Sequence, residues 1–331
     1  MQKPDNIDAL TRRIEAEGTD LRKLREGMAR AVVGQDALVR SLLVGLLADG
    51  HILLEGVPGL AKTLAVKTLA ALTDATFSRI QFTPDLLPAD VTGTLVFDQR
   101  EGRFFTRRGP VFANFVLADE INRAPAKVQS ALLEAMQERQ VTLGEETHAL
   151  PHPFLVLATQ NPVEQEGTFR LPEAQADRFM LKVHVDYPEP DHERDIIVRH
   201  LQGQATPKIQ PVLSLERLEA LRKTVHEVYV DEKIVGYILD IVDATRHFKE
   251  RSQGHHDYVA LGASPRAGIS LALAARALAF LQSRAYVVPD DVRLIAPDVL
   301  RHRISLSFEA EAERISPEDI IAEILSNVKV P

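Results

Sequence analysis

Hydrophobic and polar positions follow one pattern in the first part of the chain and another in the second. As far as about residue 186, short apolar runs alternate with stretches whose apolar residues recur at helical spacing. This alternation predicts an α/β fold, with a mostly parallel sheet covered by helices. The apolar runs lie at 52–54, 115–120, 154–159 and 180–185, and the helical spacing lies at 35–49 and 127–139.

Strand patterns nearly vanish beyond a linker with two prolines at 187–191. We therefore predict two domains, a helix-covered α/β core over 1–187 and a smaller all-helical lid over 188–331. Helical spacing in the second part falls at 215–225, 234–246, 265–284 and 289–302.

The first predicted strand runs into a loop suited to binding phosphate. Gly56 breaks the apolar run, and Lys62-Thr63 precede a helix-forming sequence. Backbone N–H groups of such a loop point at an anion, the lysine reaches the terminal phosphates, and the threonine hydroxyl binds magnesium. A chance loop between a strand and a helix is the alternative, so the motif needs support elsewhere. The predicted nucleotide-binding residues are Gly56, Val57, Pro58, Gly59, Leu60, Ala61, Lys62, Thr63 and Leu64, with Thr63 also a metal ligand.

Ala61 departs from the general phosphate-loop pattern G-x-x-x-x-G-K-[ST], which has a second glycine at that position. Alanine is tolerated there only where the backbone φ is negative, as at a helix start, and where its methyl group fits beside the phosphates. We therefore expect a negative φ at Ala61.

Polar residues end the next two predicted strands. Asp119 and Glu120 close the second apolar run, about 57 residues after Lys62. In phosphate-loop ATPases the first acid supports magnesium and the second polarises the attacking water, so Asp119 is a predicted metal ligand and Glu120 a predicted catalytic residue. Asn161 follows the third run, where a side chain that orients water or senses the γ-phosphate belongs. An ordinary strand-end turn and an Asn-Pro turn are the structural alternatives.

Together these segments resemble AAA+ ATPases, and within them the MoxR family. The resemblance covers most of the chain, from about residue 32 to about 305. It implies a P-loop AAA+ core with an all-α lid, ATP and Mg²⁺ as cofactors, and assembly with further copies of the chain. The matching segments are 56–63 (Walker A, which commonly carries this alanine in the family), 117–124 (Walker B), 158–162 (sensor 1), 164–168 with 171–179 (the arginine-finger stretch), 262–267 (sensor 2) and 33–35.

The resemblance also implies roles for residues outside the phosphate loop. Arg178 matches the arginine finger, a catalytic residue that acts on a neighbouring subunit, and Arg266 matches sensor 2, which senses the nucleotide from the lid. Phe169-Arg170 departs from the family, in which an aromatic residue followed by proline is usual, so Arg170 is the alternative finger. The segment that typically lines the adenine pocket matches Val33, Gly34 and Gln35.

Two insertions interrupt the predicted core. The segment at about 84–109 is hairpin-like around a charged turn, and the segment at about 140–150 has two alternating strands around Gly144. They resemble the helix-2 insertion and the pre-sensor-1 hairpin of the AAA+ clade that contains MoxR proteins and magnesium chelatase. We expect both to contact a client protein, and plain surface loops are the alternative.

Composition narrows the class of protein. The formal charge of −8 argues against a general nucleic-acid binder, and 45% hydrophobic residues are enough for sizeable cores. The absence of cysteine excludes disulfides and thiolate metal sites. No apolar run approaches the ~18 residues that span a bilayer, and the N-terminus lacks a signal-peptide pattern. We therefore expect a soluble, cytoplasmic protein without membrane insertion.

The sequence thus predicts an ATPase that assembles as a ring, by resemblance a hexamer, and that remodels or matures partner proteins through metal insertion or complex assembly. A von Willebrand factor A-domain protein is the partner that the resemblance implies. Two alternatives stay open, a nucleotide-switched binding protein with slow hydrolysis and a DNA-acting AAA+ module. The latter needs a basic pore or an added DNA-binding domain, and the sequence shows neither.

Overall fold

The computed structural model describes residues 7–162, 168–169, 171–203, 209–252, 254 and 256–331. Its centre is a five-stranded sheet in the order β2-β5-β8-β1-β9, in which every neighbouring pair is parallel. The predicted α/β fold with a parallel sheet is therefore confirmed. The strands are β1 (Ile52–Glu55), β2 (Phe77–Gln81), β5 (Phe115–Asp119), β8 (Leu155–Gln160) and β9 (Leu181–His184).

Alternate residues of the central strands face opposite layers of helices. Ile52 and Leu54 pack into the hydrophobic core that includes α1, α2 and α3, whereas Leu53 packs into a second core with α5. This period of two is that of a strand with both faces buried. The helix α1 lies before residue 35, where the sequence analysis singled out no element. The covering helices are α1 (Ile7–Ala31), α2 (Asp36–Leu47), α3 (Lys62–Leu72) and α5 (Ala126–Glu138).

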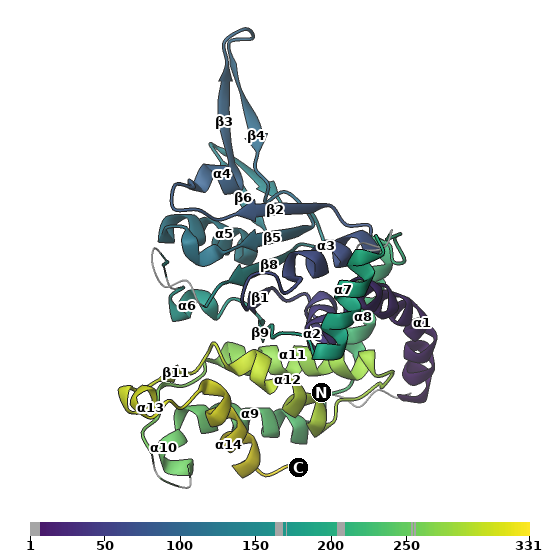
Figure 1. Ribbon diagram of the computed structural model, residues 1–331, viewed down its shortest axis with the longest axis vertical. Helices are drawn as coiled ribbons and strands as arrows, with labels where there is room; N and C mark the ends of the chain where they lie inside the picture. The colour runs from purple at the N-terminus through teal and green to yellow at the C-terminus, as the bar shows by residue number, and fades with distance from the viewer. Residues whose placement is uncertain (1–6, 163–167, 170, 204–208, 253, 255) are drawn as a thin grey trace.

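Both insertions form hairpins. After the short helix α4 (Pro88–Thr92), β3 (Gly93–Asp98) pairs antiparallel with β4 (Arg103–Arg108), and Figure 1 shows this hairpin projecting from the rest of the molecule. Gly93 is required at its base, because its φ is +100° and a Cβ there would lie 2.3 Å from the Arg107 carbonyl oxygen. The other elements of the core are β6 (Gln140–Leu143), paired antiparallel with β7 (Glu146–Ala149), and the short helices η1 (Ile121–Arg123) and α6 (Glu173–Ala176).

Where it is described, the second part of the chain is helical, as predicted, apart from a short antiparallel ladder between β10 (Val259–Leu261) and β11 (Ser305–Leu306) and an isolated bridge between Tyr229 and Tyr286. The segment predicted as a linker is short, because α7 already begins at Pro190. Helices α8 and α11 pack on α2, and α12 packs on β9, so lid and core share one hydrophobic cluster. The helices are α7 (Pro190–Leu201), α8 (Leu215–Glu227), α9 (Glu232–Arg246), α10 (Phe248–Arg251), α11 (Pro265–Leu281), α12 (Pro289–Leu300), α13 (Phe308–Glu313) and α14 (Pro317–Asn327).

A buried ion pair fastens the lid to the core. Arg303, just after α12, has 2% of its side chain exposed and pairs with Asp177 at 2.6 Å. Its guanidinium also donates to the carbonyl oxygens of Phe179 at 2.7 Å and Met180 at 3.1 Å, just before β9. Asp177 in turn accepts a hydrogen bond at 2.9 Å from the hydroxyl of Ser264, the N-cap of α11. One carboxylate thereby positions both α11 and the end of α12 against the core.

We expect Asp177→Asn to lower the free energy of unfolding by about 3 kcal/mol, because it leaves the Arg303 guanidinium buried without a counter-charge. The matched control is Glu227→Gln, which breaks the Arg13–Glu227 pair, whose side chains are 44% and 53% exposed. Screening by water limits that loss to about 1 kcal/mol or less. Urea denaturation followed by circular dichroism measures both variants, and equal losses would contradict a stabilising role for the buried pair.

Candidate functional site

The predicted phosphate loop lies at the carboxyl end of β1, and α3 begins at Lys62. The Lys62 ammonium donates to the carbonyl oxygens of Gly56 and, at 3.2 Å, of Val57. Ala61 is the N-cap of α3, and its side chain has no hydrogen-bond acceptor. The Ala61 side chain therefore accepts from none of the backbone N–H groups in the first turn of α3, which contains Thr63. Free donors at a helix start, beside a lysine, fit the phosphates of a nucleotide.

Ala61 has φ +55° and ψ 15°, a left-handed conformation. The expectation of a negative φ is therefore wrong. The chain passes through the left-handed region before the helix begins, and Ala61 lies one residue outside the helix rather than in its first turn. This conformation costs alanine about 1 kcal/mol relative to glycine, which accounts for the glycine in the general pattern.

Asp119, the last residue of β5, is held by the strands on either side of it. Its Oδ1 accepts a hydrogen bond from the Thr159 hydroxyl of β8 at 2.6 Å, and its Oδ2 accepts from Arg79 of β2 at 2.6 and 3.0 Å. Burial lowers the pKa of Lys62, and the negative charge of Asp119 and of two neighbouring carboxylates opposes this shift. Sequence reasoning gave no role to Thr159 or Arg79. A polar residue inside an apolar run is the signal that marks Thr159, whereas β2, which contains Arg79, has no such run.

Glu120 follows in a left-handed conformation, with φ +57° and ψ 50°. In a residue other than glycine this backbone costs about 1–3 kcal/mol, and such strain clusters at functional sites. The Glu120 N–H donates to the Thr159 hydroxyl oxygen at 2.8 Å, while the carboxylate accepts from Gln81 at 2.9 Å and pairs with Arg123 at 3.1 Å. Thr159 therefore positions both acids, because it donates to Asp119 and accepts from Glu120.

Asn161, directly after β8, is 6% exposed and lines a cavity of about 520 Å³ between core and lid. Asn122 and Glu55, the last residue of β1, line the same cavity. Burial alone would raise the pKa of Glu55, but hydrogen bonds and positive charge from His184 and Lys182 lower it to about 2. Since parallel strands end at one edge of a sheet, the structure brings the phosphate loop, both acids and Asn161 together there.

The predicted adenine segment, residues 33–35, connects α1 with α2. Val33 is partly buried, and Gly34 has φ +71° and lies so close to α7 that a Cβ there would be 2.7 Å from the His192 Cβ. Gln35 donates to the Asp186 carbonyl oxygen at 2.8 Å, just beyond β9. The segment therefore lies against the carboxyl end of β9 and the start of α7.

Arg178 and Arg266 lie at the opposite edge of the sheet. Arg178 donates to the Leu133 carbonyl oxygen at 2.9 Å, and Arg266 is 3.6 Å from Asp177. Both line a cavity of about 250 Å³ that also contains residues 50–51, at the amino end of β1. The strand spans about 10 Å at 3.3 Å per residue, and the phosphate loop begins beyond its other end.

The structure therefore brings Arg178 and Arg266 together and keeps both away from Lys62 of the same chain. The alternative finger, Arg170, lies outside the described residues, as do residues 163–167 of the matching stretch.

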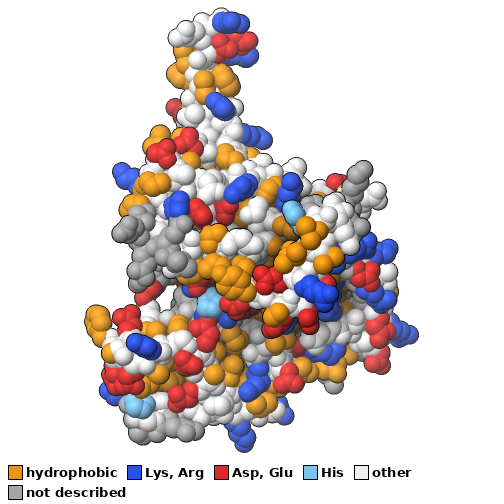
Figure 2. All heavy atoms as spheres, viewed as in Figure 1, with side chains coloured by type: hydrophobic (Ala, Val, Ile, Leu, Met, Phe, Trp, Pro, Cys, Tyr) orange, Lys and Arg blue, Asp and Glu red, His pale blue; other side chains and the backbone are white. Residues whose placement is uncertain are grey.

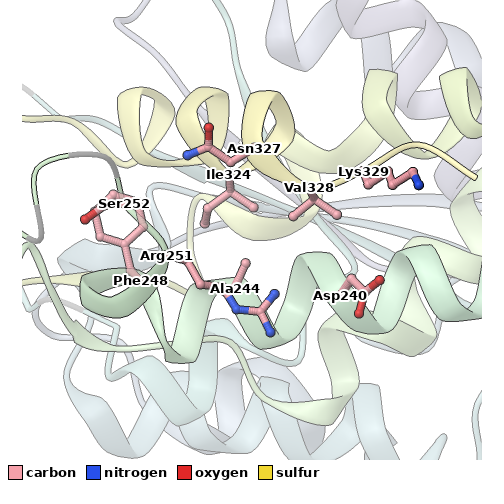
Figure 3. A pocket seen from close by; sticks show the side chains of 9 residues that line it. All are labelled: Asp240, Ala244, Phe248, Arg251, Ser252, Ile324, Asn327, Val328 and Lys329. Carbon is pink, nitrogen blue, oxygen red and sulfur yellow. The ribbon is translucent and has the colours of Figure 1, made fainter.

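A further cavity lies within the lid, away from the predicted site residues. It has a volume of about 420 Å³ and lies between α9, α10 and the end of α14, as Figure 3 shows.

Among the described residues, no group of three or more His, Cys, Asp or Glu side chains could hold a metal ion. Magnesium beside a nucleotide keeps waters and phosphate oxygens as ligands, so a site for it does not need such a group. In the described parts of the chain, no helix has the length and apolar character to cross a membrane.

Ala61→Gly should stabilise the protein by up to about 1 kcal/mol, because relief of the left-handed strain outweighs the extra entropy of an unfolded glycine. Ala71→Gly, inside the last turn of α3, is the matched control and should destabilise by about 1 kcal/mol. Urea denaturation measures both. A loss at Ala61 as large as that at Ala71 would show that the left-handed backbone at Ala61 carries no strain.

Two regions of the chain match models of known domains. Residues 51–181 match the ATPase family associated with various cellular activities (AAA), and residues 251–324 match the AAA lid domain. The chain is 53% identical to Chaperone MoxR1 of Mycobacterium tuberculosis, over 91% of this chain and 80% of that protein. It is 30% identical to Protein MoxR of Methylorubrum extorquens, over 92% of this chain and 93% of that protein. A crystal structure from Cytophaga hutchinsonii, 48% identical, has a TM-score of 0.90 and covers 96% of this chain and 97% of that one. The chain therefore belongs to the MoxR family of AAA+ ATPases.

Proposed function

We propose that the protein hydrolyses ATP as a subunit of a ring and thereby remodels or matures partner proteins. The division of the candidate site between two edges of the sheet supports this most. Lys62, Asp119 and Glu120 lie at the carboxyl edge, whereas Arg178 and Arg266 lie at the amino edge. A site divided in this way needs the arginines of a neighbouring copy, and repetition of that contact builds a ring.

Each residue at the carboxyl edge has its own role in this proposal. Lys62 and the N–H groups at the start of α3 hold the phosphates of ATP, and Thr63 and Asp119 hold Mg²⁺, which neutralises the charge that develops during phosphoryl transfer. Glu120 accepts a proton from the attacking water, and Asn161 orients that water. The adenine contacts residues 33–35, beside the start of α7.

The arginines of a neighbouring copy complete the site. Arg178 stabilises the negative charge that develops on the γ-phosphate, and Arg266 senses the bound nucleotide. Asp177 aligns the two, because it precedes Arg178 directly and lies 3.6 Å from Arg266. An isolated chain is then a weak ATPase.

The β3–β4 hairpin supplies the client contact. Large apolar side chains normally lie inside a protein, yet four on this hairpin are 40–67% exposed: Leu95, Phe97, Phe104 and Phe105. Such a surface suits the binding of apolar segments of a client, and one relative is named a chaperone.

The resemblance to the family extends the proposal in four respects. The ring is a hexamer, and its partner is a von Willebrand factor A-domain protein. Its task is metal insertion or complex assembly, and it acts in the cytoplasm.

A second candidate function is a nucleotide-switched binding protein with slow hydrolysis. The contacts of Glu120 favour it, because Gln81 and Arg123 both engage its carboxylate. Both contacts fall on one oxygen, Oε2, so they fix the orientation of the carboxylate, and that orientation is what a switch would change. Hydrolysis would then wait for a conformational change, and the ATP-bound state would persist. Steady-state turnover separates the two candidates.

Lys62→Ala should weaken ATP binding by about 10- to 100-fold, because a charge-assisted contact contributes about 1.5–3 kcal/mol. Glu120→Gln should bind ATP normally and lower turnover by about 10²- to 10⁴-fold. A fluorescent ATP analogue measures binding, and phosphate release measures turnover. Full affinity in folded Lys62→Ala would rule out the phosphate-loop assignment, and unchanged turnover in Glu120→Gln would remove its role as base.

Arg178→Ala should leave ATP affinity nearly intact and lower turnover by about 10³-fold or more, because its charge acts mainly in the transition state. Mixing is the decisive control. Rings that combine Arg178→Ala with Lys62→Ala should regain activity, since an intact loop of one chain faces an intact arginine of the other. If mixtures of Arg178→Ala with Lys62→Ala recover no activity and mixtures of Arg170→Ala with Lys62→Ala do, the arginine finger is Arg170.

A further inference from the structure

A cavity of about 420 Å³ lies between α1, α2, α11 and α12, and we call it the α1–α2 cavity. Its volume is that of a site for a small molecule. Neither the phosphate loop nor residues 33–35 line it, so it is distinct from the proposed nucleotide site. Much of its wall is apolar and suits the apolar part of a ligand. The apolar lining residues are Leu21, Val39, Leu43, Leu278, Leu281 and Leu294, and the first four are buried.

Most of the charged residues in the lining are arginines. Arg22 and Arg25 lie three residues apart on α1, so they share one face of that helix, and Arg40 comes from α2. Asp36, about one turn before Arg40, contributes a carboxylate. Figure 2 shows charges of both signs mixed at the surface where Figure 1 places α1. The lining of the cavity, in contrast, holds more positive than negative charge.

The arginines of the lining lack partners within the protein. None of the three forms a side-chain hydrogen bond or an ion pair with a residue that the structure describes. The Arg40 Nε is also buried. A buried donor without a partner is rare in a native protein, and a bound ion or molecule is one explanation for it. Arg40 is therefore available to donate to a ligand in the cavity.

Nearby carboxylates do not neutralise the arginines. Four acidic residues of α1 and α12 are paired with arginines outside the lining: Glu17 and Asp20 with Arg217, Asp291 with Arg284, and Asp298 with Arg301. Three others adjoin lining residues in the sequence but do not line the cavity: Glu15, Glu26 and Asp290. In the lining itself the carboxylate of Asp36 opposes three guanidinium groups, so an excess of positive charge remains.

We propose that the α1–α2 cavity binds an amphipathic anion, a small molecule with an apolar body and a carboxylate or phosphate head. The body packs against the leucines and releases water from apolar surface. The head accepts charge-assisted hydrogen bonds from the arginines, because a guanidinium group can donate two parallel bonds to a carboxylate or a phosphate. The buried Arg40 Nε thereby gains an acceptor. This site is separate from that of ATP hydrolysis.

Five probes separate the contributions of head and body: octanoate, octyl phosphate, octanol, acetate and inorganic phosphate. Isothermal titration calorimetry measures their dissociation constants. The tighter of the two octyl anions should bind at least tenfold more tightly than octanol, because a charge-assisted contact contributes about 10- to 100-fold in affinity. Acetate and inorganic phosphate lack the body and should bind at least tenfold more weakly than that anion. The tighter octyl anion identifies the head as a carboxylate or a phosphate.

Substitutions in the lining test the place of binding. Arg40→Gln should weaken the binding of the tighter octyl anion at least tenfold and leave that of octanol unchanged, because it removes a charge and keeps the apolar wall. Leu294→Asp changes a wall residue that is 44% exposed, and the added carboxylate should weaken the octyl anion as well. The matched control is Arg12→Gln, on α1 but outside the lining, which should bind as the wild type does. Melting temperature shows that each variant is folded.

Three results would overturn the site. The first is binding of octanol as tight as that of both octyl anions, or no measurable binding of either anion. The second is full affinity for the octyl anion in folded Arg40→Gln, or in Leu294→Asp if Arg40→Gln does not fold. The third comes from titration with the nucleotide site filled by a non-hydrolysable ATP analogue, where unchanged affinity is expected. Loss of binding there would place the anion at the nucleotide site.

Discussion

Parallel pairing of β1 with both β8 and β9 decides where the candidate site residues lie. Because parallel strands end at one edge, the loop after β1, the acids at the end of β5 and Asn161 after β8 meet there. The segment before β9, which carries Arg178, lies by the same rule at the other edge. The register fixes this arrangement, since Ile52 pairs with Leu181 and Glu55 with His184. The residues of the proposed nucleotide site therefore lie at two opposite edges of one sheet.

The position of the lid depends on contacts at the amino edge of the sheet. Asp177 precedes β9 and binds the buried Arg303, and it accepts a hydrogen bond from Ser264 at the start of α11. Arg266 follows Ser264 by two residues, so this hydrogen bond places Arg266 near Arg178. The buried pair holds lid and core together and also sets the distance between the two arginines. In the proposed ring, Arg178 of the core and Arg266 of the lid would therefore face a neighbouring copy from one side of the molecule.

Much of the carboxyl edge could be predicted from the sequence. Both faces of a parallel sheet are covered, so its strands read as apolar runs, and Lys62, Asp119 and Asn161 follow such runs closely. The φ of Ala61 was mispredicted, although the glycine of the general pattern at this position is itself a sign of a left-handed backbone. The contacts of Thr159 depend on which strands are neighbours, and local patterns do not encode the sheet order. The place of Arg178 at the opposite edge follows from its position just before a parallel strand, whereas that of Arg266 depends on the contact of the lid with Asp177.

Completion of the nucleotide site by a second copy is tested most directly by the dependence of ATP turnover on protein concentration. Turnover per chain should rise steeply as the concentration passes through the range in which sedimentation detects assembly. In Arg178→Ala it should stay low throughout that range, because assembly supplies no finger. Turnover per chain that is the same in monomeric and assembled solutions of the wild type would contradict completion of the site in trans.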